Sequence, residues 1–402
     1  MAIVATEKGY PELDLDPFST EFLTSPFSFH EQLRDAGPVV WLARYGIWAM
    51  ARYTEVSAAL NDWQTFCSRY GVGLADFKRE KPWRPPSLIL EADPPSHTRT
   101  RAVLSRVLSR PALEKLRAGF DQEAKRLVDE LLLRGRFDGV KQLAEAFPFS
   151  VFPDAVGLSR DGRENLLPYG NMVFNAFGPH NQLLQESMAS VAPAIAWITA
   201  QCRREVLSTD GIGAQIYAEA DAGHVTHEEA ALLVRSLLSA GLDTTIFGIS
   251  NALHCFASNP EQWRCLRENL ALARPAFEEV IRYAAPVQTF FRTTTKPVEV
   301  AGVCLDEGQK VLLFLAAANR DPRKWQDPDK FDIRRKTLGH VGFGYGIHTC
   351  VGQMVARLEA ESLLTVLARK VELIELTGEP TWRLNNTIRG LDTLPLALRG
   401  PR

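Results

Sequence analysis

The sequence predicts a mainly α-helical protein with small β-sheets. Apolar residues follow a helical period over most of the chain between residue 96 and about residue 300. Short apolar segments broken by glycine are confined to the region near the N-terminus, which is typical of a small sheet between helices. Of the 402 residues, 46% are apolar and 23% are charged, a globular composition that argues against disorder and fibrous repeats.

The charge balance and the cysteines exclude several classes of protein. The chain has 46 Lys and Arg against 48 Asp and Glu, a formal net charge of −2, which argues against a nucleic-acid binder. Its six cysteines form no CxxC pair, so neither a zinc finger nor a disulfide scaffold is indicated. Residues 1–17 are rich in charge and hold no apolar run, so we expect no signal peptide, no membrane anchor and a cytoplasmic location.

The elements follow in chain order. Residues 39–42 and 47–50 are apolar and are separated by Gly46, which predicts two short strands. Residues 78–96 hold five prolines and predict a loop, after which a helix is expected from Ser96 onward. Residues 353–370 predict another helix, with apolar residues and alternating charges.

A long central helix is expected to begin after Thr226, which forms a capping-box pattern with Glu229. The next proline is Pro260, so this helix can run for about 30 residues and cross the whole protein. Its interior segment 240–245, Ala-Gly-Leu-Asp-Thr-Thr, lowers helix propensity and places polar groups in an apolar helix. One interpretation is a kink with the threonine hydroxyls bonded to the preceding turn. The other is a bulge that opens a pocket and supplies Asp243 and Thr244 for proton delivery.

A glycine-rich segment with one cysteine, residues 342–352, precedes the helix at 353–370. Cys350 is expected at or just before the N-terminus of that helix, where backbone donors and the helix dipole favour a thiolate that can bind a metal. The glycines allow the backbone to pass close to a flat ligand. A phosphate-binding loop is the weaker interpretation because no Lys-Ser/Thr follows. A lone cysteine is more often a buried apolar residue than a ligand.

At these residues the chain resembles the cytochrome P450 family, the haem-thiolate monooxygenases. Residues 343–352 match the family's Phe-Gly-x-Gly-x-His-x-Cys-x-Gly form at every position. The Ala-Gly-x-Asp-Thr-Thr segment at 240–245 and a Glu-x-x-Arg pair, Glu279 and Arg282, match the family's two other motifs in the same order. The resemblance spans essentially the whole chain. It implies the cytochrome P450 fold, a triangular helical prism formed by a single domain over residues 1–402, with haem between the central helix and the cysteine-loop helix.

The resemblance also implies roles for individual residues. Cys350 is the axial ligand of the iron of haem b, in a cofactor loop that includes Phe343 and Gly344. The haem propionates are held by His97, Arg101, Arg292 and His348. Asp243 and Thr244 deliver protons for oxygen activation. Glu279, Arg282 and Arg335 form a structural charge network, although a Glu-x-x-Arg pair taken alone is usually a weak surface pair.

The resemblance further implies an O2-dependent monooxygenase, because family members that use peroxide directly tend to lack the acid-alcohol pair. No flavin or iron–sulfur domain fits in the remaining chain. Electrons are therefore expected from NAD(P)H through a separate [2Fe-2S] ferredoxin and its reductase, with the protein itself a monomer. A candidate docking surface consists of Arg323, Lys324, Lys330, Arg334, Arg335, Lys336 and Arg357. A run of charges is, however, usually only solvated.

The substrate is inferred from the expected walls of the pocket. Ser236, Ala240 and Thr244 are four residues apart and share one helix face. An arginine and hydroxyl groups at one end of an apolar slot suit a carboxylate. Several segments look like the bacterial subgroup that oxidises para-substituted benzoic acids, in which residues matching Arg84, Ser87, Tyr169 and Ser236 hold the carboxylate. Further substrate contacts are expected from Leu90, Phe174, Phe177, Arg235, Val287 and Phe290.

Our hypothesis is that the protein hydroxylates or O-demethylates the para substituent of a benzoate or a cinnamate-like acid. Two alternatives remain at this stage. Arg84 can instead stabilise its own loop or be solvated, with a neutral hydrophobic substrate such as a terpene. A non-catalytic haem sensor or carrier would keep Cys350 and the propionate ligands, but it has no need of the Asp243 and Thr244 pair.

Overall fold

The computed structural model of the chain describes residues 4–5 and 9–401. Glu7 and Lys8, two of the charged residues in the stretch 1–17, lie outside this part. Helices make up most of its regular structure. The α-helices are α1 (Thr20–Thr24), α2 (Pro26–Ala36), α3 (Tyr53–Asn61), α4 (Ser96–Val107), α5 (Arg110–Glu114), α6 (Arg117–Arg134), α7 (Ala146–Val156), α8 (Leu166–Asn175), α9 (Gln182–Ala189), α10 (Ala192–Gln201), α11 (Ile212–Asp221), α12 (His227–Ala240), α13 (Asp243–Ser258), α14 (Pro260–Glu268), α15 (Ala273–Tyr283), α16 (Leu315–Ala318) and α17 (Gln353–Lys370).

The strands are short and gather into small sheets. They are β1 (Val4–Ala5), β2 (Pro11–Leu13), β3 (Val40–Leu42), β4 (Ile47–Met50), β5 (Phe66–Cys67), β6 (Arg136–Asp138), β7 (Thr289–Thr294), β8 (Val298–Val300), β9 (Val303–Leu305), β10 (Lys310–Phe314), β11 (Leu373–Leu376), β12 (Thr381–Arg383), β13 (Gly390–Thr393) and β14 (Pro395–Arg399). The predicted mainly helical class with small sheets is confirmed.

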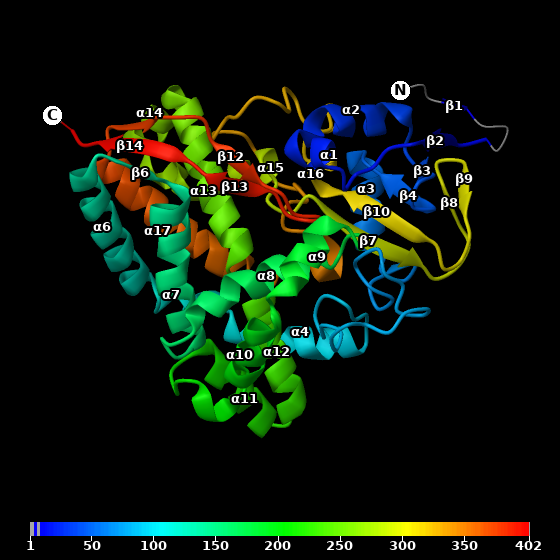
Figure 1. Cartoon of the computed structure of the whole chain (residues 1–402), viewed down its shortest axis with the longest axis horizontal. Helices are drawn as coiled ribbons and strands as arrows, with labels where there is room; N and C mark the ends of the chain where they lie inside the picture. Colours follow the sequence, from blue (N-terminus) through cyan, green and yellow to red (C-terminus); the bar gives the residue numbers. More distant parts are fainter. Residues whose placement is uncertain (1–3, 6–8, 402) are drawn as a thin grey trace.

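The largest sheet joins segments that are far apart in the sequence. Its order is β1-β2-β3-β4-β10-β7-β5, with β3 antiparallel to β4 as the apolar segments predict. Strand β10 lies parallel to β4 and antiparallel to β7, so Leu312 pairs with Ala49 on one side and Phe291 on the other. Every residue of β10 is buried. Figure 1 shows this sheet in blue and yellow beside a larger helical part, and the core of the helical part packs around α13 and α17.

The central helix begins as predicted. Thr226 Oγ1 accepts a hydrogen bond from the Glu229 amide at 3.2 Å, and Glu229 Oε2 accepts one from the Thr226 amide at 2.9 Å. These reciprocal bonds complete the capping box. The expected loop over residues 78–96 and the helices starting at Ser96 and Gln353 are also confirmed.

The central helix is interrupted within the anomalous segment 240–245, because α12 ends at Ala240 and α13 begins at Asp243. The Thr244 hydroxyl donates to the Ala240 carbonyl at 2.8 Å, and the Thr245 hydroxyl donates to the Gly241 carbonyl at 3.1 Å. These bonds are the ones expected from the first interpretation, a kink with the threonine hydroxyls bonded to the preceding turn.

The two central helices are long and apolar. Taken together, His227–Ser258 is long and apolar enough to cross a membrane, with a mean hydropathy of 1.4, but 61% of the most apolar window is buried inside the protein. A buried core helix has the same composition. We therefore assign this segment to the protein interior, where it lies between α8 and α17 (Figure 1).

Candidate active site

One cavity brings together residues from most of the sequence-predicted site. The break between α12 and α13 supplies part of its wall through Ala240, Gly241 and Thr244. The cysteine loop supplies another part through Phe343, Gly344 and Cys350. Segments around Arg84, Arg101 and Arg292 complete the wall. Residues from four distant parts of the sequence thus face one space.

The cysteine loop places Cys350 three residues before α17. The Cys350 amide donates to the Phe343 carbonyl at 2.7 Å, which closes the loop on itself. The Cys350 side chain is exposed at the cavity wall. Desolvation by the surrounding protein raises the pKa of its thiol, while the backbone amides of Gly352 and Gln353 and the charge of Arg101 act in the opposite direction. The predicted donors at the helix terminus are therefore present.

Cationic and imidazole groups gather at one side of this cavity. Arg101, Arg292 and His348 line it, and Arg292 is only 3% exposed. Burial lowers the pKa of Arg292 to about 10. His97 is not part of the cavity wall but lies directly beside it, since its ring centroid is 4.5 Å from that of His348. The four predicted propionate ligands are therefore close together.

Two of these side chains have unsatisfied buried atoms. Within the described residues, Nε2 of His97 and Nε2 of His348 are buried without a hydrogen-bond partner. Buried polar atoms in folded proteins are normally paired, so these atoms indicate a polar ligand. A thiol facing two histidines and two arginines suits haem, which has one iron to be ligated and two negative propionates. The residues present therefore fit this cofactor.

Asp93 orients the histidine end of the site and was missed in the sequence analysis. Its carboxylate accepts hydrogen bonds from the amides of Ser68 at 3.0 Å and Arg69 at 3.1 Å. It also lies 3.6 Å from Nε2 of His348, and Nδ1 of the same histidine is 3.2 Å from the Ile89 carbonyl. Only one feature of the sequence could have indicated this role: Asp93 is an acidic residue in the proline-rich loop just before the helix that carries His97.

The predicted acid-alcohol pair is split between two environments. Thr244 lines the cavity, whereas Asp243 does not and is 4% exposed. Burial raises the pKa of Asp243 to about 7, and the positive charge of Arg383 acts against this shift. The carboxyl of Asp243 lies against Gly170 of α8 and is not part of the cavity wall.

Most of the predicted substrate contacts line the cavity. The residues that do so are Arg84, Ser87, Leu90, Phe174, Phe177, Arg235, Ser236, Ala240, Val287 and Phe290. Tyr169 does not line the cavity and is 3% exposed. Tyr169 thus lies outside the cavity wall, although it is near Arg235: burial lowers the pKa of Arg235, and Tyr169 raises it by less.

The polar end of the cavity contains an acid that the sequence analysis missed. Glu91 Oε2 is 2.9 Å from Nη1 of Arg84, and it also accepts a hydrogen bond from the Ser87 amide at 2.7 Å. Ser87 Oγ lies 3.1 Å from Ser236 Oγ, and Arg235 donates to the Pro85 carbonyl at 2.7 Å. Arg84 thus both faces the cavity and stabilises its own loop.

The predicted Glu-x-x-Arg network is fully buried. Arg282 Nε lies 2.7 Å from Glu279 Oε2, and neither side chain is exposed. Arg335 Nε lies 3.2 Å from Glu279 Oε1, and this arginine also donates to the carbonyls of Gln326 and Asp327. Because Arg335 is committed to this network, it is removed from the candidate docking surface.

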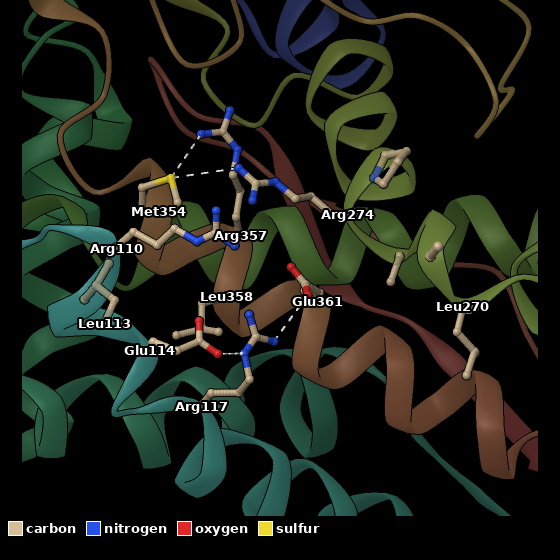
Figure 2. A pocket seen from close by; sticks show the side chains of 13 residues that line it. Arg110, Leu113, Glu114, Arg117, Leu270, Arg274, Met354, Arg357, Leu358 and Glu361 are labelled. Carbon is tan, nitrogen blue, oxygen red and sulfur yellow. Dashed lines mark hydrogen bonds and ion pairs between the residues drawn. The ribbon is translucent and has the colours of Figure 1, made fainter.

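A second hollow, of about 290 Å³, lies on the opposite face of the first turns of α17. We call it the arginine cleft, and its charged lining residues are Arg110, Glu114, Arg117, Arg274, Arg357 and Glu361. Figure 2 shows Arg117 between Glu114 and Glu361, and Arg274 and Arg357 pointing toward Met354. In the described part of the chain, Arg110 and Arg274 take part in no ion pair. Of the predicted docking residues, Arg357 lines this cleft, where it also pairs with Glu278.

Comparisons with known proteins agree with this site. The family profile described as Cytochrome P450 matches residues 159–394. Cytochrome p450 CYP199A2 of Rhodopseudomonas palustris is 58% identical over 97% of this chain and 95% of its own length. Cytochrome P450 107B1 of Saccharopolyspora erythraea is 33% identical over 87% of this chain and 88% of its own length.

Solved structures share the fold. Cytochrome P450 CYP109Q5 from Chondromyces apiculatus superposes with a TM-score of 0.81 and 30% identity, over 96% of this chain and 98% of its own. Cytochrome P450 CREJ, in complex with (4-ethylphenyl) dihydrogen phosphate, superposes with a TM-score of 0.84 and 26% identity over 98% and 100% of the two chains.

Proposed function

Because this chain belongs to the cytochrome P450 family, we propose that it hydroxylates or O-demethylates the para substituent of a small aromatic carboxylic acid, a benzoate or a cinnamate. The family shows a haem-b monooxygenase that receives electrons from NAD(P)H through redox partners. The substrate class is our inference. The observation that carries it is the polar end of the cavity, where Arg84, Arg235, Ser87 and Ser236 line the same space as the apolar residues Leu90, Phe174, Phe177, Val287 and Phe290.

When bound, haem supplies the activation of O2 and the oxidation of the substrate's C–H bond. In our proposal Cys350 holds the iron, and Arg101, Arg292, His97 and His348 hold the propionates. The unsatisfied buried Nε2 atoms of the two histidines support this assignment, as do the positions of Arg101, Arg292 and His348 in the cavity wall. Phe343 and Gly344 belong to the same cofactor loop. A cofactor shared by segments from the whole chain also supports a single domain over residues 1–402.

The proton path of the reaction involves Asp243 and Thr244 in this proposal. Thr244 faces the cavity, while the carboxyl of Asp243, with its pKa raised to about 7, can hold or release a proton near neutral pH. A carboxyl with this pKa is matched to proton transfer at the pH of a bacterial cell. We assign to Asp243 the transfer of a proton from the protein interior toward Thr244.

The substrate acid lies along the cavity in one orientation. Its carboxylate takes hydrogen bonds from the guanidinium groups of Arg84 and Arg235 and from the Ser87 hydroxyl, beside which Ser236 lies. Its ring packs against the apolar wall, which consists of Leu90, Phe174, Phe177, Ala240, Val287 and Phe290. Binding at the far end then presents the para substituent toward Thr244 and Cys350. The benzoate-oxidising subgroup resembled by the sequence supports the same orientation.

A relative supports small aromatic anions as ligands of this fold. The structure of CREJ contains (4-ethylphenyl) dihydrogen phosphate, a para-substituted aromatic anion, although that chain is only 26% identical to this one. We propose a carboxylate rather than a phosphate for this chain. The site has two arginines, Arg84 and Arg235, and Glu91 pairs with Arg84 and so offsets part of their positive charge.

Electrons are proposed to arrive from a [2Fe-2S] ferredoxin and its NAD(P)H-dependent reductase. Met354, Arg357 and Leu358 of α17 line the arginine cleft, while Val355 and Ala356 of the same helix line the cavity. A partner bound at the cleft is thus one helix away from the proposed haem. The two arginines there without ion pairs suit an acidic partner.

A ligand series tests the substrate class. The haem-loaded protein is titrated with 4-methoxybenzoate, its methyl ester and its amide, and the change in haem spin state is followed. We expect the acid to bind at least about tenfold more tightly than either neutral compound, because only the acid pairs with the arginines. Arg84→Ala should weaken acid binding by more than about 1.5 kcal/mol. If the neutral compounds bind as tightly as the acid, the carboxylate proposal fails and a neutral substrate is favoured.

A further inference from the structure

We infer that Glu91 is a specificity-determining residue, which sets the charge at the polar end of the cavity so that it accepts one singly charged carboxylate. This inference rests on the proposed function. It assigns a role to a side chain that belongs neither to the apolar wall nor to the groups proposed to bind the acid.

The contacts of Glu91 place it behind the proposed anchors of the substrate. Its side chain is 3% exposed, and Oε2 lies 2.9 Å from Nη1 of Arg84. The same oxygen accepts a hydrogen bond from the Ser87 amide at 2.7 Å. One buried carboxylate oxygen of Glu91 therefore fixes both Arg84 and Ser87, the two loop residues that face the substrate. Glu91 acts on the substrate through them.

The local charges leave one positive charge in excess. The guanidinium groups of Arg84 and Arg235 are close to each other. Burial is the main cause that lowers the pKa of Arg235; the positive charge of Arg84 lowers it further, and the negative charge of Glu91 raises it by less. Arg235 donates to the Pro85 carbonyl and takes part in no ion pair within the described chain. Two cations and one buried anion match a ligand with a single negative charge.

Donor capacity also remains at this end. Nε of Arg84 is buried and has no partner among the described residues. The single hydroxyl proton of Ser236 is already donated to the Leu232 carbonyl at 2.9 Å, so the free donors at this end are those of the two arginines. The carboxylate of the substrate can therefore accept hydrogen bonds from nitrogens that are not bonded to Glu91. Glu91 and the substrate need not compete for Nη1 of Arg84.

Glu91→Gln separates this role from a purely structural one. Glutamine has the same shape, and its single carbonyl oxygen can accept the bonds from Arg84 and Ser87 that Oε2 accepts now. The substitution removes the buried negative charge while leaving both contacts in place. Glu80→Gln is the matched control, because it changes the net charge equally but Glu80 is an exposed residue of the same loop.

The measurement is isothermal titration calorimetry of the haem-loaded wild-type, Glu91→Gln and Glu80→Gln proteins with 4-methoxybenzoate and with 4-methoxybenzamide. We expect Glu91→Gln to bind the acid about tenfold more tightly, since a like charge near the ligand is removed. Binding of the amide should change by less than about threefold. Glu80→Gln should behave like the wild type for both ligands.

The outcomes distinguish the inference from the proposed function. If the wild type does not prefer the acid to the amide, the carboxylate site itself is wrong. If the wild type prefers the acid but Glu91→Gln changes acid and amide affinities in parallel, Glu91 is only a brace for the loop and the inference is overturned. Weaker acid binding by Glu91→Gln, with unchanged amide binding, also overturns it.

Discussion

The carboxyl group of Asp243 on α13 fills the space left by the missing side chain of Gly170 on α8. A Cβ atom on Gly170 would lie 1.9 Å from Oδ2 of Asp243, far inside contact distance. The carboxyl of Asp243 thus occupies space that Gly170 leaves free and is not part of the cavity wall, whereas the adjacent Thr244 lines the cavity. Any side chain at position 170 must displace this carboxyl.

Gly170→Ala should therefore disturb proton delivery more than substrate binding. We expect the affinity for 4-methoxybenzoate to stay within about threefold, and the product formed per NADH consumed to fall by about tenfold. Product and NADH are measured together in a reconstituted assay. Gly119→Ala is the control, because nothing lies within 4 Å of a Cβ at that position. Equal coupling in the two variants would contradict a positioning role for Gly170.

Asp243→Asn should change the pH dependence of stability. The pKa of Asp243 is raised to about 7 by burial in the folded protein, so the folded state holds its proton more tightly than the unfolded state. Its contribution to stability is complete below about pH 4 and is lost as the pH rises to about 7. Asparagine does not ionise, so the variant should gain stability relative to the wild type by up to about 1.4 kcal/mol for each pH unit in that interval.

Urea unfolding of both proteins at about pH 5 and about pH 8 checks this prediction. The difference in unfolding free energy, Asp243→Asn minus wild type, should be larger at the higher pH. A difference that is the same at both pH values would show that Asp243 is ionised throughout and that its pKa is not raised.

Much of the fold was predictable because it depends on local sequence. The capping box at Thr226 and Glu229, the helix starting at Gln353 and the strand pair near the N-terminus are each set by nearby residues. The break after Ala240 lies inside the segment 240–245 that the sequence marks as anomalous, but the sequence left its form open. The threonine hydroxyls bond to carbonyls of the preceding turn there, and sequence alone does not decide between that bend and a continuous helix.

The errors in the site come from contacts between distant segments. The direction of the Asp243 carboxyl depends on Gly170, and nothing in the sequence around Asp243 signals that contact. Tyr169 is buried outside the cavity wall, since each helix presents only part of its surface to the cavity. Glu91 follows Arg84 by seven residues in a proline-rich loop, and no periodic pattern predicts their ion pair.

Glu279→Gln should destabilise the protein strongly. Glu279 is fully buried between Arg282 and Arg335, so removing its charge leaves two guanidinium groups without their partner. We expect a loss of about 3–5 kcal/mol in the free energy of unfolding. Glu268→Gln, in an exposed pair with Arg264 at 3.9 Å, should cost less than about 0.5 kcal/mol.

Urea denaturation measures the free energy of unfolding of the wild type and of both variants. A variant that is expressed but yields no soluble protein is scored as strongly destabilised. Similar stability of Glu279→Gln and Glu268→Gln would mean that the buried network contributes little to the fold.

Charge reversal in the arginine cleft should slow electron transfer. Arg274 lines the cleft and has no ion pair within the described residues, so Arg274→Glu places a negative charge where an acidic partner is proposed to dock (Figure 2). At low ionic strength we expect reduction by a [2Fe-2S] ferredoxin to slow by about tenfold, with a smaller effect at high salt. Stopped-flow absorbance follows the reduction.

Lys296→Glu is the control for this experiment, because Lys296 is exposed in the turn between β7 and β8, away from α17. Substrate affinity should be unchanged in both variants. If the two charge reversals slow reduction equally, the partner does not recognise the arginine cleft.

The most direct test of the central claim is turnover of 4-methoxybenzoate by the haem-loaded protein with NADH, O2, a [2Fe-2S] ferredoxin and its reductase. O-demethylation converts one substrate, one O2, one NADH and one proton into 4-hydroxybenzoate, formaldehyde, water and NAD⁺. We predict that both carbon products form in equal amounts. Tight binding of the acid without either product, or turnover of the methyl ester at the same rate, would contradict an aromatic-acid monooxygenase.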